Sequence, residues 1–235
     1  MVVREGSQFA CVCVGDKFTP DYVRNLYRGV ERGCQDSFGF TVFVDDATRE
    51  GVAREVGHLE GVRIEEDRVL KGGPVLRDTG NWYWWAKLNV FRDDLWEPGS
   101  MVLYLDLDSV VRRNLDRLMD RQRFHMIGWP RNGNRLGSGV MLVPAGKLSD
   151  LFHGFKTPMI DQFPKGDQYY IAREVADIGR FTVSDVCSYK KHWVRRGWRR
   201  MGSVHASVVA FHGNPMPHQL PEGDGLRRLW SGGYL

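Results

Sequence analysis

The sequence has no apolar run long enough to cross a membrane. Its longest apolar stretches, FACVCV and MVLYL, are far shorter than the roughly 20 residues that a membrane-spanning helix needs. The chain also opens without the charged and then apolar segment that is typical of a secretory signal. We therefore expect a cytoplasmic protein with no transmembrane segment.

Cysteine is sparse in this chain. There are 4 Cys, none in C-x-x-C spacing and too few for a disulfide scaffold. Cys11 and Cys13 stand two residues apart in an apolar run, so in a strand both side chains would lie on one face. We expect buried, reduced thiols.

Nucleotide-binding motifs and domain boundaries are missing as well. Neither G-x-x-x-x-G-K-[ST] nor G-x-G-x-x-G follows the first predicted strand, which argues against a P-loop or Rossmann nucleotide enzyme.

No Pro/Ser linker, low-complexity tract or internal repeat divides the chain. With 235 residues, 42% of them apolar and 12% aromatic, the chain can fill one sizeable core. We predict a single domain over residues 1–235.

The charge of the chain is modest in total and uneven along it. The net charge is +4, but basic residues cluster within 110–117 and 194–200 and at Arg227 and Arg228. Such clusters indicate an anionic partner, for which a nucleotide would suffice.

The sequence alternates between strand and helix patterns up to about residue 150. Apolar, β-branched runs predict strands, and apolar residues at helical spacing predict helices between them. Strands are expected over 9–15, 38–47, 62–67, 101–111, 124–129 and 139–144, and helices over 19–33, 48–59 and 83–91. In the last helix, we expect Trp84, Leu88 and Phe91 to share one face. This alternation predicts an α/β fold with a mostly parallel sheet flanked by helices.

The remainder of the chain, after residue 150, is rich in Gly, Pro, His and aromatic residues. We expect it to form the wall of an active site and not a second core.

Two aspartates are the first candidates for chemistry. Asp106 and Asp108 end an apolar run, and residues two apart in a strand project from one face. Ligands of α/β sheets bind at the carboxyl ends of the strands. Two neighbouring carboxylates are costly to bury unless a cation lies between them, and Mg²⁺ or Mn²⁺ fits best. The alternative is that each aspartate only caps a turn, because D-x-D spacing also arises by chance.

Three later segments offer further candidates. His212 ends a strand-like run and enters a Gly/Pro-rich turn, Ser138 stands between two glycines before a strand, and Asp167 precedes a predicted helix. Taken singly, these patterns are more typical of a loop histidine, a plain turn and a helix cap. These residues indicate a function only when they are considered together, in their order along the chain.

In that order the segments resemble a known family. The chain contains, in sequence, FTVFVDD, YWWAKLNVF, VLYLDLDSVV, LGSGVML, GDQYYI, SYKKHW and FHGNPMPH. This set is similar to the retaining glycosyltransferases of family 8, the glycogenin-like group, and most of all to a bacterial and phage branch of short enzymes with the GT-A fold. The resemblance spans nearly the whole chain. It implies a Rossmann-like GT-A domain that transfers a sugar from a nucleotide-diphosphate donor, expected to be a UDP-sugar.

The resemblance also implies roles for individual residues. Asp106, Asp108 and His212 would bind Mn²⁺ or Mg²⁺ together with the donor diphosphate, and Asp106 would also lie near the ribose. Lys87, Asp167 and Gln168 would form the catalytic set near the donor, the transferred sugar and the acceptor. The other residues expected to line the donor are Val14, Gly15, Asp16, Ser138, Gly139 and Gly213. Residues 1–150 would form the nucleotide-sugar half and 151–235 the acceptor side.

Two positions depart from the family pattern. Met216 stands before Pro217 where related chains usually carry a lysine, which removes one phosphate contact. Gly137 stands where they often have asparagine, which removes an amide that could hydrogen-bond the donor sugar. The identity of the sugar is therefore not predicted.

Sugar transfer breaks the bond between the anomeric carbon and the diphosphate, so groups that stabilise the leaving phosphate lower the barrier. A divalent ion would do so, and Lys87 could add a charge-assisted contact. The resemblance implies retention of configuration without a protein nucleophile. If the enzyme inverts, Asp167 is the first candidate for the general base.

The acceptor stays open between a glycan, a small molecule, a protein and DNA. Aromatic and cationic residues alternate around Arg195, Arg196, Arg199 and Arg200, as they do on nucleic-acid surfaces. A phage-type DNA glycosyltransferase, acting in the host cytoplasm, is therefore one alternative. A nucleotide-sugar hydrolase or a non-catalytic nucleotide-sugar-binding protein is another.

Overall fold

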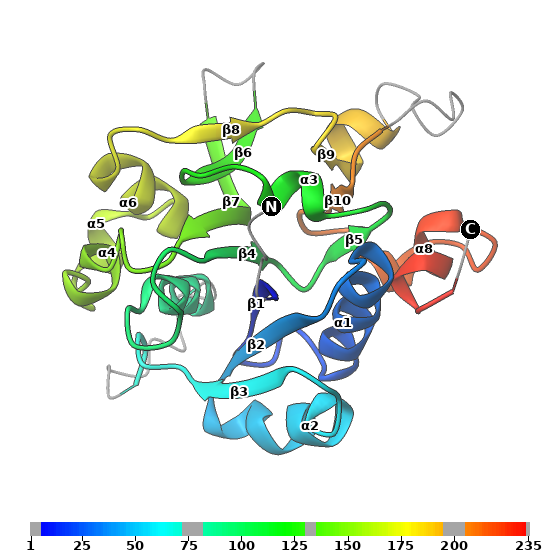
Figure 1. Cartoon of the computed structure of the whole chain (residues 1–235), viewed down its shortest axis with the longest axis horizontal. Helices are drawn as coiled ribbons and strands as arrows, with labels where there is room; N and C mark the ends of the chain where they lie inside the picture. The colour runs from blue at the N-terminus through cyan, green and yellow to red at the C-terminus, as the bar shows by residue number, and fades with distance from the viewer. Residues whose placement is uncertain (1–5, 72–81, 130–134, 195–204, 234–235) are drawn as a thin grey trace.

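A seven-stranded sheet runs through the middle of the molecule (Figure 1). The computed structural model describes residues 6–71, 82–129, 135–194 and 205–233. The strand order is β3-β2-β1-β4-β7-β6-β8, and β7 alone runs antiparallel to its neighbours. The strands are β1 (Ser7–Cys13), β2 (Phe38–Val44), β3 (Val62–Glu66), β4 (Met101–Leu105), β6 (His125–Trp129), β7 (Arg135–Pro144) and β8 (Gly179–Phe181). The predicted α/β fold with a mostly parallel sheet is confirmed.

Helices cover both faces of this sheet. One face carries α1 (Asp21–Gly33), α2 (Asp46–Val56) and α3 (Asp116–Met119), and the other carries a ten-residue 3₁₀ helix, η2 (Trp82–Phe91), with three short α-helices. These three are α4 (Asp150–His153), α5 (Met159–Gln162) and α6 (Asp167–Glu174). No helix within the described residues is long and apolar enough to span a membrane.

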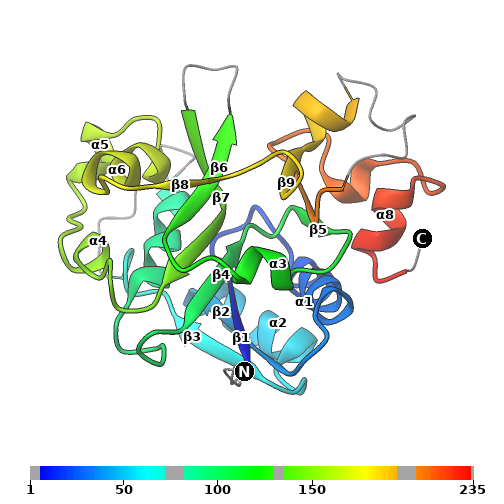
Figure 2. The same ribbon diagram turned by 45° about the horizontal axis from the view of Figure 1, so that its top comes forward.

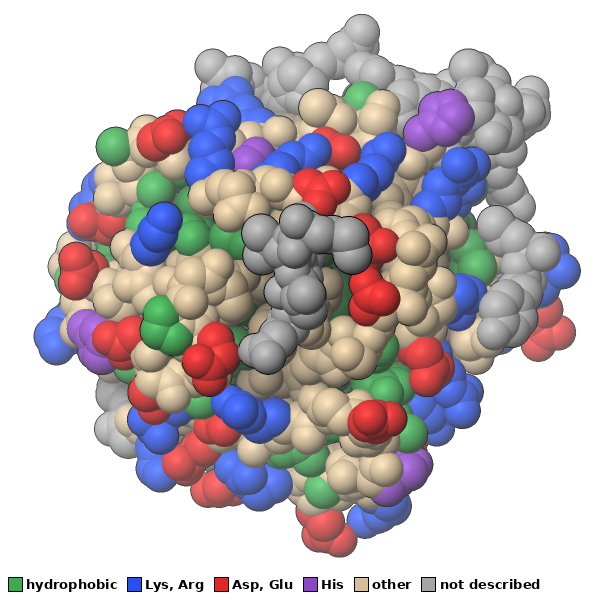
Figure 3. All heavy atoms as spheres, in the orientation of Figure 1, with side chains coloured by type: hydrophobic (Ala, Val, Ile, Leu, Met, Phe, Trp, Pro, Cys, Tyr) green, Lys and Arg blue, Asp and Glu red, His purple; other side chains and the backbone are tan. Residues whose placement is uncertain are grey.

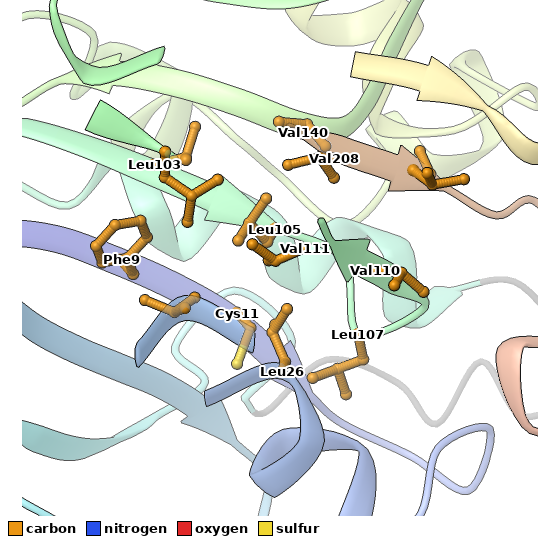
Figure 4. Close-up of a cluster of buried hydrophobic side chains, with 14 of the residues drawn as sticks. Phe9, Cys11, Leu26, Leu103, Leu105, Leu107, Val110, Val111, Val140 and Val208 are labelled. Carbon is orange, nitrogen blue, oxygen red and sulfur yellow. The ribbon is translucent and has the colours of Figure 1, made fainter. Parts of the chain in front are cut away.

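Strand β1 shows how the alternation of side chains divides the core. Phe9, Cys11 and Cys13 pack into the cluster beneath α1, while Ala10 belongs to the cluster beneath η2. Figure 4 shows Phe9 and Cys11 beside Leu26 of α1, with Leu103 of β4 close by. Cys11 and Cys13 are free, buried thiols that share one face of the strand, as predicted.

Residues 101–111 form two strands where the sequence predicts one. β4 ends at Leu105, and β5 (Ser109–Val111) belongs to a separate three-stranded sheet of order β5-β10-β9. A turn separates them, closed by the Ser109 N–H donating to the Asp106 carbonyl at 2.9 Å. The two aspartates therefore lie on a turn between sheets and not along a continuous strand. An apolar run of this kind does not reveal a change of sheet, because both strands are buried.

The described part of the chain beyond residue 150 adds buried side chains to both clusters. Strands β9 (Val186–Ser188) and β10 (Val208–Ala210) and the last helix, α8 (Gly225–Trp230), all bury side chains in the cluster that holds Phe9. Figures 1 and 2 both show α8 beside α1. Two short helical turns connect these elements, the π-helical η3 (Tyr189–Val194) and the 3₁₀ helix η4 (Pro217–Gln219).

Candidate active site

The number of residues per turn in helix η2 decides which of its side chains line the site. A 3₁₀ helix has three residues per turn, so Trp85, Leu88 and Phe91 align, and all three are buried. The face predicted from an α-helical period was therefore wrong in placing Trp84 with Leu88 and Phe91. With a period of three, Trp84 aligns with Lys87 instead, and these two line a cavity.

An ion pair between Lys87 and Asp106 lies at the base of this cavity. Nζ of Lys87 donates to the Asp106 carboxylate at 3.0 Å and lies 3.4 Å from Oγ of Ser138. The Tyr104 hydroxyl donates to Oδ1 of Asp106 at 2.8 Å. Burial lowers the pKa of Lys87, but the carboxylates around it, Asp106 and Asp167 above all, outweigh burial and raise the pKa to about 12. Lys87 is therefore a permanently charged, buried ammonium.

Asp108 lies on the same turn and is almost fully buried, at 3% exposed. Burial, and then the neighbouring charge of Asp106, raise its pKa to about 7, and Lys17 and Lys87 oppose that rise. A buried carboxyl group whose ionisation is disfavoured in this way belongs to a site that an added cation would stabilise.

His212 reaches the same cavity from the end of β10. The Phe211 N–H donates to the Asp108 carbonyl at 3.3 Å, which holds this segment against the aspartate turn. Nε2 of His212 is hydrogen-bonded to Oγ of Ser188 at 2.8 Å. Burial, and then the charge of Lys191, lower the pKa of His212 to about 4. The imidazole is thus neutral at physiological pH, which is the form that binds metals.

Asp167 begins α6 and points its carboxylate inward. The structure places Gly166, not Asp167, at the N-cap, and Asp167 makes no capping hydrogen bond. Its carboxylate accepts instead from Ser138, and burial raises its pKa while Lys87 opposes the rise. Oδ2 is buried without a hydrogen-bond partner among the described residues. A buried oxygen of this kind is costly unless a ligand donates a proton to it.

These residues surround one open cavity of about 440 Å³. It brings together most of the residues predicted from the sequence: Lys87, Asp106, Asp108, Ser138, Gly139, Asp167, Gln168, His212 and Gly213. Sequence reasoning missed three further lysines, Lys17, Lys165 and Lys191, in its lining. Lys191 belongs to the SYKKHW segment quoted from the sequence, and Lys17 and Lys165 stand directly beside residues singled out there. That position was the only available signal. Lysines are so common at protein surfaces that their nearness to these segments did not indicate a role in the site.

Val14, Gly15 and Asp16, which were expected to line the donor, are not among the residues that line this cavity. Val14 lines a second, smaller cavity of about 220 Å³ with Asp45 and Trp82. The Gly15 N–H donates to Oδ2 of Asp45 at 2.8 Å, and Asp16 is exposed. The four arginines of the predicted nucleic-acid surface, Arg195, Arg196, Arg199 and Arg200, lie outside the described residues. On the face drawn in Figure 3, acidic and basic side chains of the described residues are interspersed.

The predicted metal ligands share the large cavity, but they do not form a closed ligand cluster. Among the described residues, no three His, Cys, Asp or Glu side chains gather closely enough to hold a metal. Asp106 instead pairs with Lys87. The donor chemistry nevertheless fits a divalent ion, since two oxygen ligands and a neutral imidazole face one space and Ser188 already orients the imidazole, as outer partners of metal-bound histidines do.

The sequence of the chain was compared with those of known proteins and protein families. No protein-family profile matches the chain. Over 185 residues, or 77% of the chain, it is 25% identical to inositol phosphorylceramide glucuronosyltransferase 1 of Arabidopsis thaliana, and it spans only about a third (33%) of that protein.

Solved structures resemble the chain over nearly its full length. The galactosyltransferase LgtC, solved with donor and acceptor sugar analogues, superposes with a TM-score of 0.69 at 15% identity, covering 96% of this chain and 95% of LgtC. The apo form of the glycosyltransferase GlyE of Streptococcus pneumoniae superposes with a TM-score of 0.62 at 14% identity, covering 95% of this chain and 59% of GlyE. The chain therefore has the GT-A fold of these glycosyltransferases.

Proposed function

We propose that the chain is a glycosyltransferase that moves a sugar from a uridine diphosphate sugar to a hydroxyl group of an acceptor. The observation that carries the proposal is the meeting of Lys87, Asp106, Asp108, Asp167 and His212 around one cavity in a GT-A fold. A volume of about 440 Å³ is in the usual range for a pocket that takes a small-molecule ligand. The cavity follows the carboxyl end of β4, where sheets of this type bind ligands.

Asp106, Asp108 and His212 are the residues that would hold a divalent ion, Mn²⁺ or Mg²⁺. Such an ion supplies Lewis-acid stabilisation of the negative charge on the leaving diphosphate. The protein's own contribution begins with Lys87, whose ammonium remains charged at all physiological pH values. It holds the Asp106 carboxylate in place and adds a positive charge beside the phosphates.

The other lining residues bind and orient the sugar. The unpartnered Oδ2 of Asp167 accepts a hydrogen bond from a sugar hydroxyl, and Gln168 next to it offers a side-chain amide. Lys17 and Lys191, on the side of Asp108 and His212, attract the diphosphate. The proposal includes retention of configuration, in which the departing phosphate takes the proton of the acceptor hydroxyl.

Calorimetry with UDP-, GDP-, TDP- and ADP-sugars tests the proposal. We expect one nucleotide class to bind in Mn²⁺, and binding to be lost with a chelator or in Asp108→Asn. Asp161→Asn is the matched control, because Asp161 is an exposed aspartate in α5 that does not line the cavity. If the folded protein binds none of these donors, the glycosyltransferase proposal is wrong.

Product analysis tests the reaction itself. Incubation of the donor that binds with a library of glycans and small hydroxylated acceptors should yield a glycosylated product by mass spectrometry. Release of free sugar at the same rate with and without every acceptor would identify a hydrolase instead.

A further inference from the structure

The cavity holds more positive charge than the proposed donor and ion would use. The charged side chains that line it are four lysines and three aspartates: Lys17, Lys87, Lys165, Lys191, Asp106, Asp108 and Asp167. They leave an excess of one positive charge. A divalent ion would raise the excess to three, and the two phosphates of a nucleotide sugar, each carrying one negative charge, would still leave one cation unmatched.

Three of the four lysines act on the residues that would hold the ion. Lys87 is hydrogen-bonded to Asp106. The charge of Lys17 acts on Asp108, and the charge of Lys191 acts on His212. The unmatched cation is therefore the fourth lysine.

Lys165 lines the same cavity and stands two residues before Asp167 and three before Gln168 in the sequence. It is exposed, and no ion pair involves it among the described residues. Its Nζ lies 5.2 Å from the centre of the Tyr169 ring, and its carbonyl accepts from the Gln168 side chain at 3.4 Å. The side chain thus stands over the start of α6 with its charge available to a ligand.

The backbone around Lys165 is held in place. Gly166 has a φ of +89°, and a Cβ there would come within 2.8 Å of Cε3 of Trp84, so the chain packs directly against the indole ring. One residue further on, the buried Oδ2 of Asp167 has no partner among the described residues. Within the described part of the chain, a buried acceptor without a hydrogen bond and an ammonium without an ion pair therefore stand two residues apart in the lining of the cavity.

We propose that Lys165 binds a carboxylate or phosphate group of a substrate while Asp167 accepts a hydrogen bond from a hydroxyl of the same molecule. The anionic group belongs either to the transferred sugar, which is then a uronic acid, or to the acceptor. The inference rests on the proposed function, because the donor diphosphate and its ion are what engage the other three lysines.

A matched pair of donors tests the first source. UDP-glucose and UDP-glucuronate differ only at C6, where the second carries a carboxylate. In calorimetry with Mn²⁺, we expect the full chain to bind UDP-glucuronate roughly tenfold more tightly, which is a usual gain from a charge-assisted hydrogen bond. Lys165→Gln should remove the difference. Lys156→Gln, at an exposed lysine that does not line the cavity, should retain it.

A matched set of acceptors tests the second source when the two donors bind alike. Glucose, glucose 6-phosphate and glucuronate are compared as soluble probes of binding to the complex of the protein with UDP and Mn²⁺. We expect the anionic probes to bind roughly tenfold more tightly than glucose, and Lys165→Gln to abolish that preference. Higher salt should weaken the preference as well, because the lysine is exposed.

The outcomes separate the two proposals. If UDP binds with Mn²⁺ but anionic and neutral probes behave alike in both sets, or if Lys165→Gln keeps the preference, the role of Lys165 is wrong and the glycosyltransferase proposal stands. If the folded protein binds neither UDP nor any nucleotide sugar, both proposals fail together.

Discussion

At the scale of single residues, the pair of Lys87 and Asp106 connects the stability of the chain to its proposed chemistry. Both side chains are largely buried, at 10% and 26% exposed. A buried pair adds little net stability while it is intact, but removing one partner leaves an uncompensated charge. The ammonium and a divalent ion can each supply the positive charge that Asp106 requires.

Lys87→Met should therefore destabilise the protein and make it more responsive to metal. We expect a loss of about 2 kcal/mol in the free energy of unfolding without metal. Mn²⁺ should raise the melting temperature of the variant more than that of the wild type, because the ion neutralises the stranded carboxylate. Thermal unfolding with Mn²⁺ and with chelator measures both effects.

Lys156→Met is the control for this variant, since Lys156 is exposed. Its unfolding free energy should stay within about 0.5 kcal/mol of the wild type. Equal stability of Lys87→Met and the wild type without metal would contradict the prediction.

Gly139 leaves room for the Asp106 carboxylate. A Cβ at this position would lie 3.0 Å from Oδ2 of Asp106, closer than side chains normally tolerate. Gly139→Ala should therefore displace the carboxylate and weaken Mn²⁺-dependent UDP binding roughly tenfold, as loss of a supporting contact commonly does. Gly223→Ala is the control, because a Cβ there would meet nothing within 4 Å. Unchanged UDP binding in Gly139→Ala would contradict this prediction.

At the scale of elements, the start of α2 is tied to the loop after β1 by one side chain. Oδ1 of Asp45 accepts from the Thr48 N–H at 2.9 Å and caps the helix, while Oδ2 accepts from the Gly15 N–H at 2.8 Å. Asp45 thus has a structural role as the N-cap of α2.

Two substitutions separate these two functions of Asp45. Asp45→Ala loses both bonds and should lower the free energy of unfolding by about 2 kcal/mol. Asp45→Asn keeps an oxygen for the cap but presents an NH₂ to Gly15, so it should cost about 1 kcal/mol. Asp46→Ala, at the exposed neighbour, should cost less than about 0.5 kcal/mol. Urea unfolding measures all three. Equal costs for Ala and Asn at position 45 would mean that the cap contributes nothing, and a variant with Asn as stable as the wild type would mean that the bond to Gly15 contributes nothing.

For helix η2, the sequence predicted that a helix forms but not its number of residues per turn. The run from Trp82 to Phe91 was correctly predicted as helical, because aromatic and aliphatic residues recur along it. Its period was not, because every residue from Trp85 to Phe91 is buried and a fully buried segment has no polar stripe to reveal 3.0 or 3.6 residues per turn. Because the helix has three residues per turn, Trp84 shares a face with Lys87 and not with Leu88.

At the scale of the whole molecule, the pattern of strands and helices predicted the main sheet but not the small one. The strands of the main sheet are five to ten residues long, except β8, and they alternate with helices. The strands β5, β9 and β10 have three residues each, too few for any periodicity to show. The cavity lies between the two sheets, so His212 could be placed in it only through its resemblance to a family motif.

A buried aspartate fastens the small sheet to the rest of the molecule. Asp185, just before β9, accepts from Arg121 at 2.7 Å and from the backbone and hydroxyl of Thr182 at 2.8 and 2.9 Å. Arg121 lies between α3 and β6, in the part of the chain that belongs to the main sheet. Burial alone would raise the pKa of Asp185, but the hydrogen bonds from Arg121 and Thr182 outweigh it and lower the pKa below its usual value.

The sign of this shift sets the pH dependence of the stability. A carboxylate whose pKa is lower in the folded chain stabilises the protein above its unfolded pKa, near 3.9, and loses that contribution as the pH falls through the folded value. Asp185→Asn should therefore lower the free energy of unfolding by about 2 kcal/mol at pH 7. The gap between variant and wild type should narrow below about pH 4, where the wild-type carboxyl becomes protonated.

Urea unfolding of both proteins from pH 7 to pH 3 measures that gap, with Asp177→Asn as the control because its ion pair with Arg123 is exposed. A gap that stays constant over this range would mean that the charge of Asp185 contributes nothing and that only its shape is needed between the sheets. A gap that closes on acidification identifies this ionised side chain as the link that holds β9 and β10, and with them His212, against the main sheet.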